Sequence, residues 1–226
     1  MSDALDDLPL FRGLGPEQMA GVRARFHDVS HPAGTVIIAE DAPGDSVFVV
    51  VSGAVKVHIS AAEHDVILAV LGPGQVVGEM SVVDALGRSA NVTALEDSRM
   101  LEMDRAEFWQ MLSADPVTTV NLAGTLSRRV RMANDHIEML TALDVGGRLA
   151  RVFLSLAREY GRPPVTGPGT LIPIPLTQSD LGAMVGASRV RVNQVMGNFR
   201  TRGLISADDR HRVTVLDEAA LEKRCR

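Results

Sequence analysis

The stretch Gln178-Ser-Asp-Leu-Gly-Ala-Met-Val-Gly186-Ala-Ser-Arg-Val-Arg-Val-Asn-Gln-Val195 carries the clearest structural signal in the chain. It begins inside Thr177-Gln-Ser-Asp180, which has the form of a capping box and predicts a helix start. Gly186 permits a left-handed turn, Ser188 can cap a second helix, and Gly182 lets that helix approach closely. Apolar residues stand where two steeply crossing helices bury them: Leu181, Val185, Val192 and Val195. The pattern predicts a helix-turn-helix, with an ordinary helical hairpin as the alternative.

The residues around this motif are basic. Residues 145–226 hold 13 Lys and Arg against 7 Asp and Glu, a net charge of +6, whereas residues 1–144 hold 10 against 21, a net charge of −11. A basic third on an acidic body indicates a polyanionic partner, and beside a helix-turn-helix that partner is double-stranded DNA. The alternative is a basic face that is only solvated.

The second helix of the motif supplies the candidate DNA contacts, because its first turns face the major groove in this geometry. Arg189 is the candidate to read guanine, Gln194 could pair with adenine, and Val190 can only touch a thymine methyl or fill space. The candidate DNA-binding residues are Ser179, Ser188, Arg189, Val190, Arg191 and Gln194. The arginines expected on phosphates, which position the protein without reading sequence, are Arg191, Arg200, Arg202, Arg210 and Arg212.

Further elements are predicted on both sides of the motif. The apolar face of residues 145–160 predicts a helix. Leu171–Leu176 contains two prolines and is predicted as an edge strand or an extended linker. Leu204–Ser206 and Arg212–Val215, joined by a turn at Asp208-Asp209, predict a wing-like hairpin.

The first half of the chain has the pattern of a strand-rich domain. Short β-branched runs recur between turn signals, at Thr35–Ala39, Val47–Val51, Ala54–Ile59, Val66–Leu71, Asn91–Ala94 and Met100–Met103. No helical crossovers separate these runs, so a sandwich, barrel or jelly roll is expected rather than a parallel sheet. A short helix is predicted before them at Pro16–Arg25. After them, Asp104-Arg-Ala-Glu107 has the form of a capping box, and Trp109 is expected to pack.

One long helix is predicted from Pro116 to Leu143. Six of its residues are spaced alternately by three and four, as in a heptad seam: Ala123, Leu126, Val130, Ala133, Ile137 and Leu140. This dimer seam predicts a parallel homodimer. Leu122, Met132 and Met139 lie off the seam and are expected to pack on the strand-rich domain. The alternative is a helix buried on both sides within a single chain.

Composition excludes several classes of function. A lone Cys225 excludes a disulfide framework and a cysteine-rich metal site, and the six scattered histidines predict no metal centre. The acidic N-terminus lacks a secretory signal, and no apolar run approaches the roughly 20 residues of a membrane span, so a cytoplasmic protein without membrane contact is expected. No nucleophile–base motif or P-loop is present, which predicts that the chain is not an enzyme. A redox role of Cys225 is left open.

Nearly the whole chain resembles the CRP/FNR family of bacterial transcription regulators. The most specific piece is Gly78-Glu-Met-Ser-Val-Val-Asp-Ala-Leu-Gly-Arg88-Ser-Ala90, which resembles the phosphate-binding cassette of cyclic-nucleotide domains. Residues 143–150 and Ser188-Arg189 also resemble the family. The resemblance implies a site for the effector at Gly78, Glu79, Met80, Arg88, Ser89 and Ala90.

The chemistry of these residues fits a cyclic phosphate. Gly78 can start a short helix whose backbone N–H groups face the phosphate. Arg88 would pair with the phosphate charge, Ser89 would donate its hydroxyl, and Glu79 would accept a hydrogen bond from the ribose 2′-hydroxyl. The alternative is a glycine-bounded surface loop with a structural Glu–Arg pair.

Two positions depart from the cyclic AMP-binding branch of the family. That branch holds adenine with a Thr-Ser pair on the long helix, where this chain has Ala133 and Asn134. Ala133 cannot hydrogen-bond a base, whereas the Asn134 amide offers both a donor and an acceptor and is the candidate base contact. In the recognition helix, Val190 replaces a Glu that accepts from cytosine N4, so the operator of that branch is not expected here.

The sequence therefore predicts an α+β protein in three parts: a β jelly-roll cyclic-nucleotide-binding domain over residues 1–115, a dimerisation helix over 116–143, and a winged helix-turn-helix DNA-binding domain over 144–226. The predicted function is a homodimeric transcription regulator that binds a palindromic operator and responds allosterically to cyclic AMP, with no resident cofactor. One alternative is a regulator that is constitutive or senses another effector, and another is a regulatory module of an enzyme. Contact with RNA polymerase, and activation versus repression, are left open.

Overall fold

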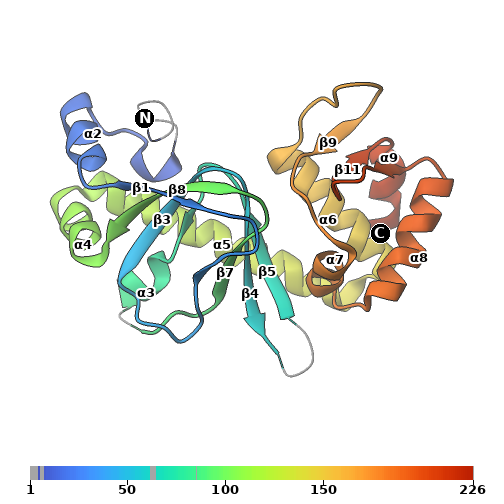
Figure 1. The fold of residues 1–226 in the computed structure, drawn as a ribbon, viewed down its shortest axis with the longest axis horizontal. Helices are drawn as coiled ribbons and strands as arrows, with labels where there is room; N and C mark the ends of the chain where they lie inside the picture. The colour runs from blue at the N-terminus through green and yellow to red at the C-terminus, as the bar shows by residue number, and fades with distance from the viewer. Residues whose placement is uncertain (1–4, 6–7, 62–64, 85, 226) are drawn as a thin grey trace. The chain divides into compact units, whose positions relative to one another are not determined.

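The computed structural model describes residue 5 and residues 8–61, 65–84 and 86–225, and Figure 1 shows the ribbon. Contacts between Cα atoms divide the chain into two compact units. The first unit comprises residues 1–59 and 69–132, and the second comprises residues 60–68 and 133–226. Among the described residues, no helix combines the length and the apolarity needed to cross a membrane.

Eight strands form two four-stranded sheets in the first half of the chain (Figure 1). One sheet has the order β1-β8-β3-β6, with β1 at His27–His31, β8 at Ser98–Asp104, β3 at Ser46–Ser52 and β6 at Val76–Val77. The other has the order β2-β7-β4-β5, with β2 at Val36–Ile38, β7 at Asn91–Ala94, β4 at Val55–Ser60 and β5 at Asp65–Leu71. Non-consecutive strands pair in an antiparallel sense, which confirms the predicted α+β class with an antiparallel first half.

Two strands have no counterpart in the prediction. Strand β1 consists mainly of polar residues and is mostly exposed, so it shows no apolar alternation; its pairing with β8 places it in the sheet. Strand β6 is only two residues long, too short for any periodicity. The six strands that were predicted are present; β7 has the predicted ends, and the ends of the others differ by at most two residues.

One core cluster of the first unit lies between one sheet and several helices: η1 at Pro9–Phe11, α2 at Pro16–Arg23, α4 at Arg105–Ala114 and the start of α5 at Pro116–Ala142. A second cluster, which includes Phe48 and Val92, is formed by residues of both sheets. Phe11 and Phe108 are fully buried there, and the ring centroids of Phe11 and Phe26 are 6.0 Å apart. One bond of the predicted capping box of α4 is present, since Asp104 accepts a hydrogen bond from the Glu107 backbone N–H at 2.8 Å.

The long helix α5 exposes much of the predicted dimer seam. Val130 and Ile137 are 60% and 61% exposed, and Ala123 and Ala133 are exposed too. Leu126 and Leu140 are half-buried, and Leu126 also packs against the core of the first unit. Leu122 is buried in the core of the first unit, as expected. Met139 is buried too, but it belongs to the second unit, so its packing on the strand-rich domain stays a prediction. Met132 is 44% exposed, so the prediction that it packs on the strand-rich domain is wrong.

After the end of α5, the described part of the second unit contains four α-helices and a three-stranded sheet. The helices are α6 at Val145–Tyr160, α7 at Gln178–Val185, α8 at Arg189–Thr201 and α9 at Glu218–Glu222, followed by η2 at Lys223–Cys225. The sheet has the order β10-β11-β9, with β10 at Ile205–Ala207, β11 at Val213–Val215 and β9 at Thr170–Ile172. Strand β9 lies at an edge, as its prolines predict.

Helices α7 and α8 form the predicted helix-turn-helix (Figure 1). The capping box of Thr177 and Asp180 is complete, and the Ser188 hydroxyl accepts from the Arg191 N–H. Gly186 has φ of 62° and ψ of 46°, the left-handed conformation that was expected. A β-carbon on Gly182 would lie 2.6 Å from the carbonyl oxygen of Ala187, so the chain needs a glycine there.

Three glycine-to-alanine substitutions test this geometry. Gly186→Ala should lower the free energy of unfolding by about 1 kcal/mol, because alanine resists the left-handed conformation. Gly182→Ala should lower it further, because its β-carbon meets a backbone atom. Gly197→Ala, in an open position of α8, should raise it by about 0.5–1 kcal/mol. Chemical denaturation followed by far-ultraviolet circular dichroism gives the three values; equal effects of Gly182→Ala and Gly197→Ala would contradict the close approach.

Candidate functional site

A small cavity in the first unit brings the predicted cassette residues together. Its volume is about 60 Å³. It lies where the short helix α3 at Glu79–Asp84 begins, beside residues of strands β2, β4, β6 and β7 and one residue of α5. The residues that line it are Ile38, Val57, Val77, Gly78, Glu79, Met80, Ser81, Arg88, Ser89, Ala90, Val92 and Arg129.

Gly78 holds the start of this cassette in a conformation that suits glycine. Its φ is +83°, and a β-carbon on it would lie 2.5 Å from Arg88 Nη1 and 3.0 Å from the Ser46 carbonyl oxygen. The Gly78 carbonyl accepts hydrogen bonds from Arg88 Nη1 at 2.8 Å and from the Ser81 hydroxyl at 3.2 Å. The turn and the arginine therefore fix each other.

Arg88 is a buried cation held by neutral acceptors. Only 6% of the residue is exposed. Besides Gly78, its guanidinium donates to the Ser81 hydroxyl at 2.9 Å and to the Ser46 carbonyl at 2.7 Å, and within the described residues no carboxylate forms an ion pair with it. Burial lowers the pKa of Arg88, and the charges of Asp45 and Glu79 oppose that effect in part. The group still stays protonated at neutral pH, so the cavity wall is positive.

Glu79 brings a negative charge to the same cavity. It is fully buried, and its Oε1 forms an ion pair with Arg129 Nη1. The other oxygen, Oε2, is buried and has no hydrogen-bond partner. A buried carboxylate oxygen without a donor is costly, so this atom is a ready acceptor for a hydroxyl from a ligand.

Arg129 is a residue of this cavity that the sequence did not reveal. It stands on α5 and also donates to the Val76 carbonyl. Arg129 and Glu79 are 50 positions apart in the chain, so the local sequence around Arg129 does not predict their contact. Its only sequence signal is its place directly before Val130 of the predicted seam.

The remaining residues of the predicted ligand site differ in exposure. Ala90 is buried, whereas Ser89 and Met80 are exposed at the cavity. Ala133 and Asn134 are exposed residues of the second unit, and the contact of Asn134 with a base stays a prediction. Trp109 of α4 is 41% exposed, yet its indole N–H donates to the Val82 carbonyl of α3 at 2.9 Å, so it packs as expected.

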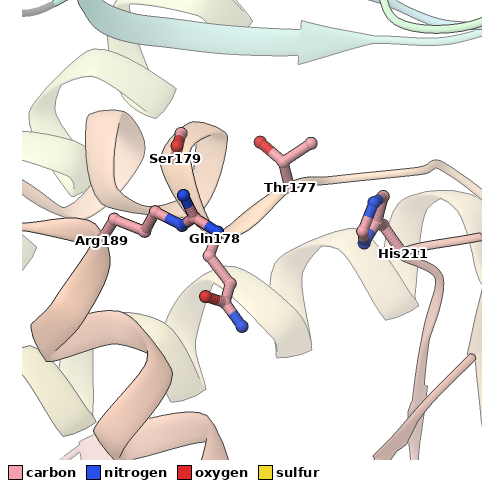
Figure 2. Close-up of a pocket in the computed structure, with 5 residues that line it drawn as sticks. All are labelled: Thr177, Gln178, Ser179, Arg189 and His211. Atoms are coloured by element: carbon pink, nitrogen blue, oxygen red, sulfur yellow. The ribbon is translucent and has the colours of Figure 1, made fainter. Parts of the chain in front are cut away.

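A second cavity, of about 340 Å³, lies on the helix-turn-helix. It is lined by Thr177, Gln178, Ser179, Arg189 and His211 (Figure 2). Figure 2 shows Arg189 reaching from α8 toward the first turn of α7, with His211 opposite on the wing turn. The structure thus brings the predicted Ser179 and Arg189 together. Thr177, Gln178 and His211 were missed, because only the fold places the wing turn beside the first turn of α7.

The other predicted DNA-binding residues lie on the exposed side of α8. Ser188, Val190, Arg191 and Gln194 are all exposed, and Arg191 Nη1 donates to Gln194 Oε1 at 3.3 Å. Hydrogen-bonding groups there are accessible to a partner.

Asp208 orders the turn of the wing. Its carboxylate accepts from the backbone N–H groups of Arg210 and Arg212 at 3.0 and 2.9 Å, and from Arg212 Nε at 2.7 Å. Burial raises the pKa of Asp208, but the hydrogen bonds from Arg212 and Arg210 outweigh that effect and lower the pKa overall. The wing therefore presents its arginines and His211 on a fixed turn.

The junction between α5 and α6 consists of Leu143 and Asp144 only. Arg148 donates to three carbonyls around it, those of Leu140 at 2.7 Å, Leu143 at 2.9 Å and Val185 at 3.0 Å. One side chain thereby joins the end of the long helix to the end of α7. Within the described residues, no group of three or more His, Cys, Asp or Glu could hold a metal ion.

Comparisons with known proteins identify two domains in the chain. Residues 28–115 match the family model of the cyclic nucleotide-binding domain, and residues 147–224 match that of the Crp-like helix-turn-helix domain. The chain is 30% identical over 227 residues to a CRP-like cAMP-activated global transcriptional regulator of Mycobacterium tuberculosis, and the match covers 100% of both chains. It is 32% identical over 200 residues to the cyclic AMP receptor protein of Thermus thermophilus, covering 87% of this chain and 88% of that protein.

Solved structures share the fold. The structure of FixK2 from Bradyrhizobium japonicum superposes with a TM-score of 0.77 at 20% identity, covering 88% of this chain and 96% of that chain. At that identity the likeness concerns the fold alone.

The fixed pairing of Gly78 and Arg88 can be tested against a matched glycine. Gly74 has φ of +88° but only Leu8 Cδ2 near its β-carbon position, at 3.6 Å, so Gly74→Ala carries the conformational cost without a severe clash. Gly78→Ala should lower the free energy of unfolding by about 1–3 kcal/mol more than Gly74→Ala, because it displaces the buried guanidinium. Denaturation followed by the fluorescence of Trp109, the single tryptophan, measures both. Equal costs would show that Arg88 is not held by this turn.

Proposed function

The chain belongs to the CRP/FNR family of DNA-binding transcription regulators, and from this premise we propose that it is a homodimer whose DNA binding is controlled by a cyclic nucleotide, with cyclic AMP as the first candidate. Its effector would bind in the cavity at Gly78–Ala90, and its helix-turn-helix would bind a palindromic operator.

One observation carries the effector proposal: among the described residues, a buried cation that forms no direct ion pair and a buried acceptor without a donor line the same cavity. Arg88 supplies the first and Glu79 Oε2 the second. A cyclic nucleotide has a phosphate anion and a ribose hydroxyl donor on adjacent parts of one molecule. It would satisfy both groups at once, with the exposed Ser89 hydroxyl donating to the phosphate.

The size of the cavity limits how the nucleotide sits. Ligand pockets commonly have volumes of about 300–1,000 Å³, well above the 60 Å³ here. The cavity would therefore take the phosphate and part of the ribose, and the base would extend beyond Met80 and Ser89, which are exposed. Asn134 would hold an adenine there through its amide, which gives a donor and an acceptor for adenine N6 and N7.

The proposed dimer uses the exposed seam of α5. Val130 and Ile137 are large apolar residues exposed by about three-fifths, and a second copy would cover them. Arg129, next to Val130, holds Glu79 in the cavity. A nucleotide that engages Glu79 would therefore act on an ion pair with the dimer helix itself.

The proposed mechanism is a shift between two conformational populations. Nucleotide would favour a state in which the two recognition helices match successive major grooves, about 34 Å apart. A hundredfold preference for that state corresponds to about 2.7 kcal/mol of coupling. Motion would occur at the junction of α5 and α6, where only two residues separate the helices.

A second candidate is a regulator of the same family that is constitutive or senses another small effector. Two observations favour it. Ala133 offers no hydrogen bond to a base, and Arg88 already has protein acceptors for its guanidinium. Such a protein would keep its DNA binding while showing no response to cyclic AMP.

Calorimetric titration of nucleotide-stripped protein with cyclic AMP and cyclic GMP tests the effector. We expect saturable binding of cyclic AMP, weakened about 10- to 150-fold by Arg88→Ala, since a charge-assisted hydrogen bond contributes about 1.5–3 kcal/mol. Ser89→Ala, at an exposed hydroxyl, should weaken it about 2- to 12-fold without a folding effect. Arg99→Ala, which removes an exposed ion pair with Asp28 in the same unit, is the control and should bind normally. No heat with either nucleotide, from folded protein, would favour the second candidate.

DNA recognition can be tested with operators selected from a random library. Arg189→Ala should weaken binding to the selected operator by about 1–3 kcal/mol and relax the choice of one base pair, because a bidentate contact with guanine is lost. Arg202→Ala should weaken binding to operator and to random DNA by the same factor, because a phosphate contact carries no sequence information. Gel-shift titrations at fixed salt measure, for each variant, the affinities for the selected operator and for random DNA relative to the wild type. An unchanged sequence preference in Arg189→Ala would remove that residue from the reading set.

A further inference from the structure

The segment Lys223–Cys225 packs on the first turn of α6, directly after the junction with the long helix. It follows α9, which lies beside α6 (Figure 1) and is anchored by the fully buried Leu221. This contact belongs neither to the ligand cavity nor to the DNA-facing residues.

Two consecutive glycines make the contact possible. Gly146 and Gly147 are both buried in the first turn of α6. A β-carbon on Gly147 would lie 2.7 Å from the backbone carbonyl oxygen of Arg224, and one on Gly146 would lie 2.7 Å from Arg224 Nη2. Glycine weakens a helix relative to alanine, so a glycine pair here needs a reason, and the close approach of the segment supplies it.

Polar contacts tie the same segment to the helix start. Asp144 caps α6 by accepting from the Gly147 N–H at 2.7 Å through Oδ1, while its Oδ2 lies 3.7 Å from Arg224 Nη2. The Cys225 thiol donates to the Leu221 carbonyl at 3.4 Å and to the Gly147 carbonyl at 3.8 Å. The Asp144 side chain is 72% exposed, so its ion pair contributes little by itself, and the packing on the glycines is the main contact.

We infer that Lys223–Cys225 is a clamp on the α5–α6 junction, and that it sets how strongly the state of the effector changes DNA affinity. Arg148 fixes the same junction to α7. With the contacts of Arg148 and of the clamp both in place, the first turn of α6 moves together with the end of α5. Without the clamp, that turn is held by fewer contacts, and part of any motion of α5 is lost before it reaches α8. The inference rests on the proposed function.

Two glycine variants of the full chain test the clamp. Gly147→Ala places its β-carbon against a backbone atom and must displace the segment. In Gly146→Ala the β-carbon meets the end of the flexible Arg224 side chain, which can swing aside, and lies 3.3 Å from Asp144 Oδ1, but it meets no backbone atom of the segment. We expect Gly147→Ala to reduce the cyclic AMP-induced gain in DNA affinity at least about fivefold, a change within the usual range of coupling between sites, and to leave cyclic AMP affinity unchanged. Gly146→Ala, the matched control, should keep most of the gain.

The β-carbon on Gly147 would also lie 3.2 Å from Leu143 Cβ, so a second pair of variants separates the two contacts. In a chain that stops after Glu222, Gly147→Ala should have almost no further effect on coupling, because the segment it would displace is absent. If Gly147→Ala reduces coupling by the same factor in the shortened chain, the effect comes through Leu143 and the clamp is refuted.

Amide hydrogen exchange gives a readout that does not depend on the proposed function. In the absence of nucleotide, peptides covering residues 143–150 should exchange at least about tenfold faster in Gly147→Ala and in the shortened chain than in the wild type. If the wild type shows no response of DNA affinity to any nucleotide, the proposed effector control fails, and the exchange rates still test the clamp. Unchanged exchange in both variants would overturn it.

Discussion

A buried guanidinium is costly unless its N–H groups are hydrogen-bonded, and the architecture around the cavity at residues 78–90 supplies neutral acceptors to Arg88. The left-handed turn at Gly78, the start of α3 and the start of β3 all supply acceptors to this one group. Because those acceptors are neutral, the positive charge is held in place without being cancelled. An anion that enters the cavity therefore meets a preorganised partner. The start of α3 contacts Arg88, and Trp109 of α4 donates a hydrogen bond to the Val82 carbonyl of the same helix.

The second constraint is the ion pair between Glu79 and Arg129, which makes the long helix part of the cavity wall. Dimerisation alone would not require α5 to place a charged side chain in a cavity of the first unit, as it does with Arg129. Arg129 of α5 contacts the cavity, and the next residue, Val130, is exposed. At the other end of α5, Arg148 donates hydrogen bonds to the carbonyls of Leu140, near the end of α5, and Val185, at the end of α7. The helix is thus joined by specific side-chain contacts to both the cassette and the helix-turn-helix.

Local chemistry was predictable from the sequence, and distant pairing was not. The capping box at Thr177, the left-handed Gly186 and the cap at Ser188 each depend on residues within a few positions, so the helix-turn-helix was placed correctly. Strand β1 was not predicted, because its polar residues show no apolar alternation. It is a strand because it pairs with β8. Arg129 and His211 were not predicted for a related reason: each is brought to its cavity by the folding of segments that are distant in the sequence. Met132 was misplaced because a helical stripe does not by itself say which side the chain covers.

The position of β9 at the edge of its sheet affects whether strands of other molecules can pair with that sheet. Open sheet edges invite strands of neighbouring molecules to add to them, and two DNA-binding units on adjacent half-sites would stand at high local concentration. The outer edge of β9 offers little to such a strand. Leu171 already exchanges two backbone hydrogen bonds with Arg162, at 2.8 and 3.0 Å, and Pro173 directly after the strand has no N–H to give. Pro173 and the Arg162 bridge thereby leave few backbone groups on this edge for a strand of another molecule to pair with.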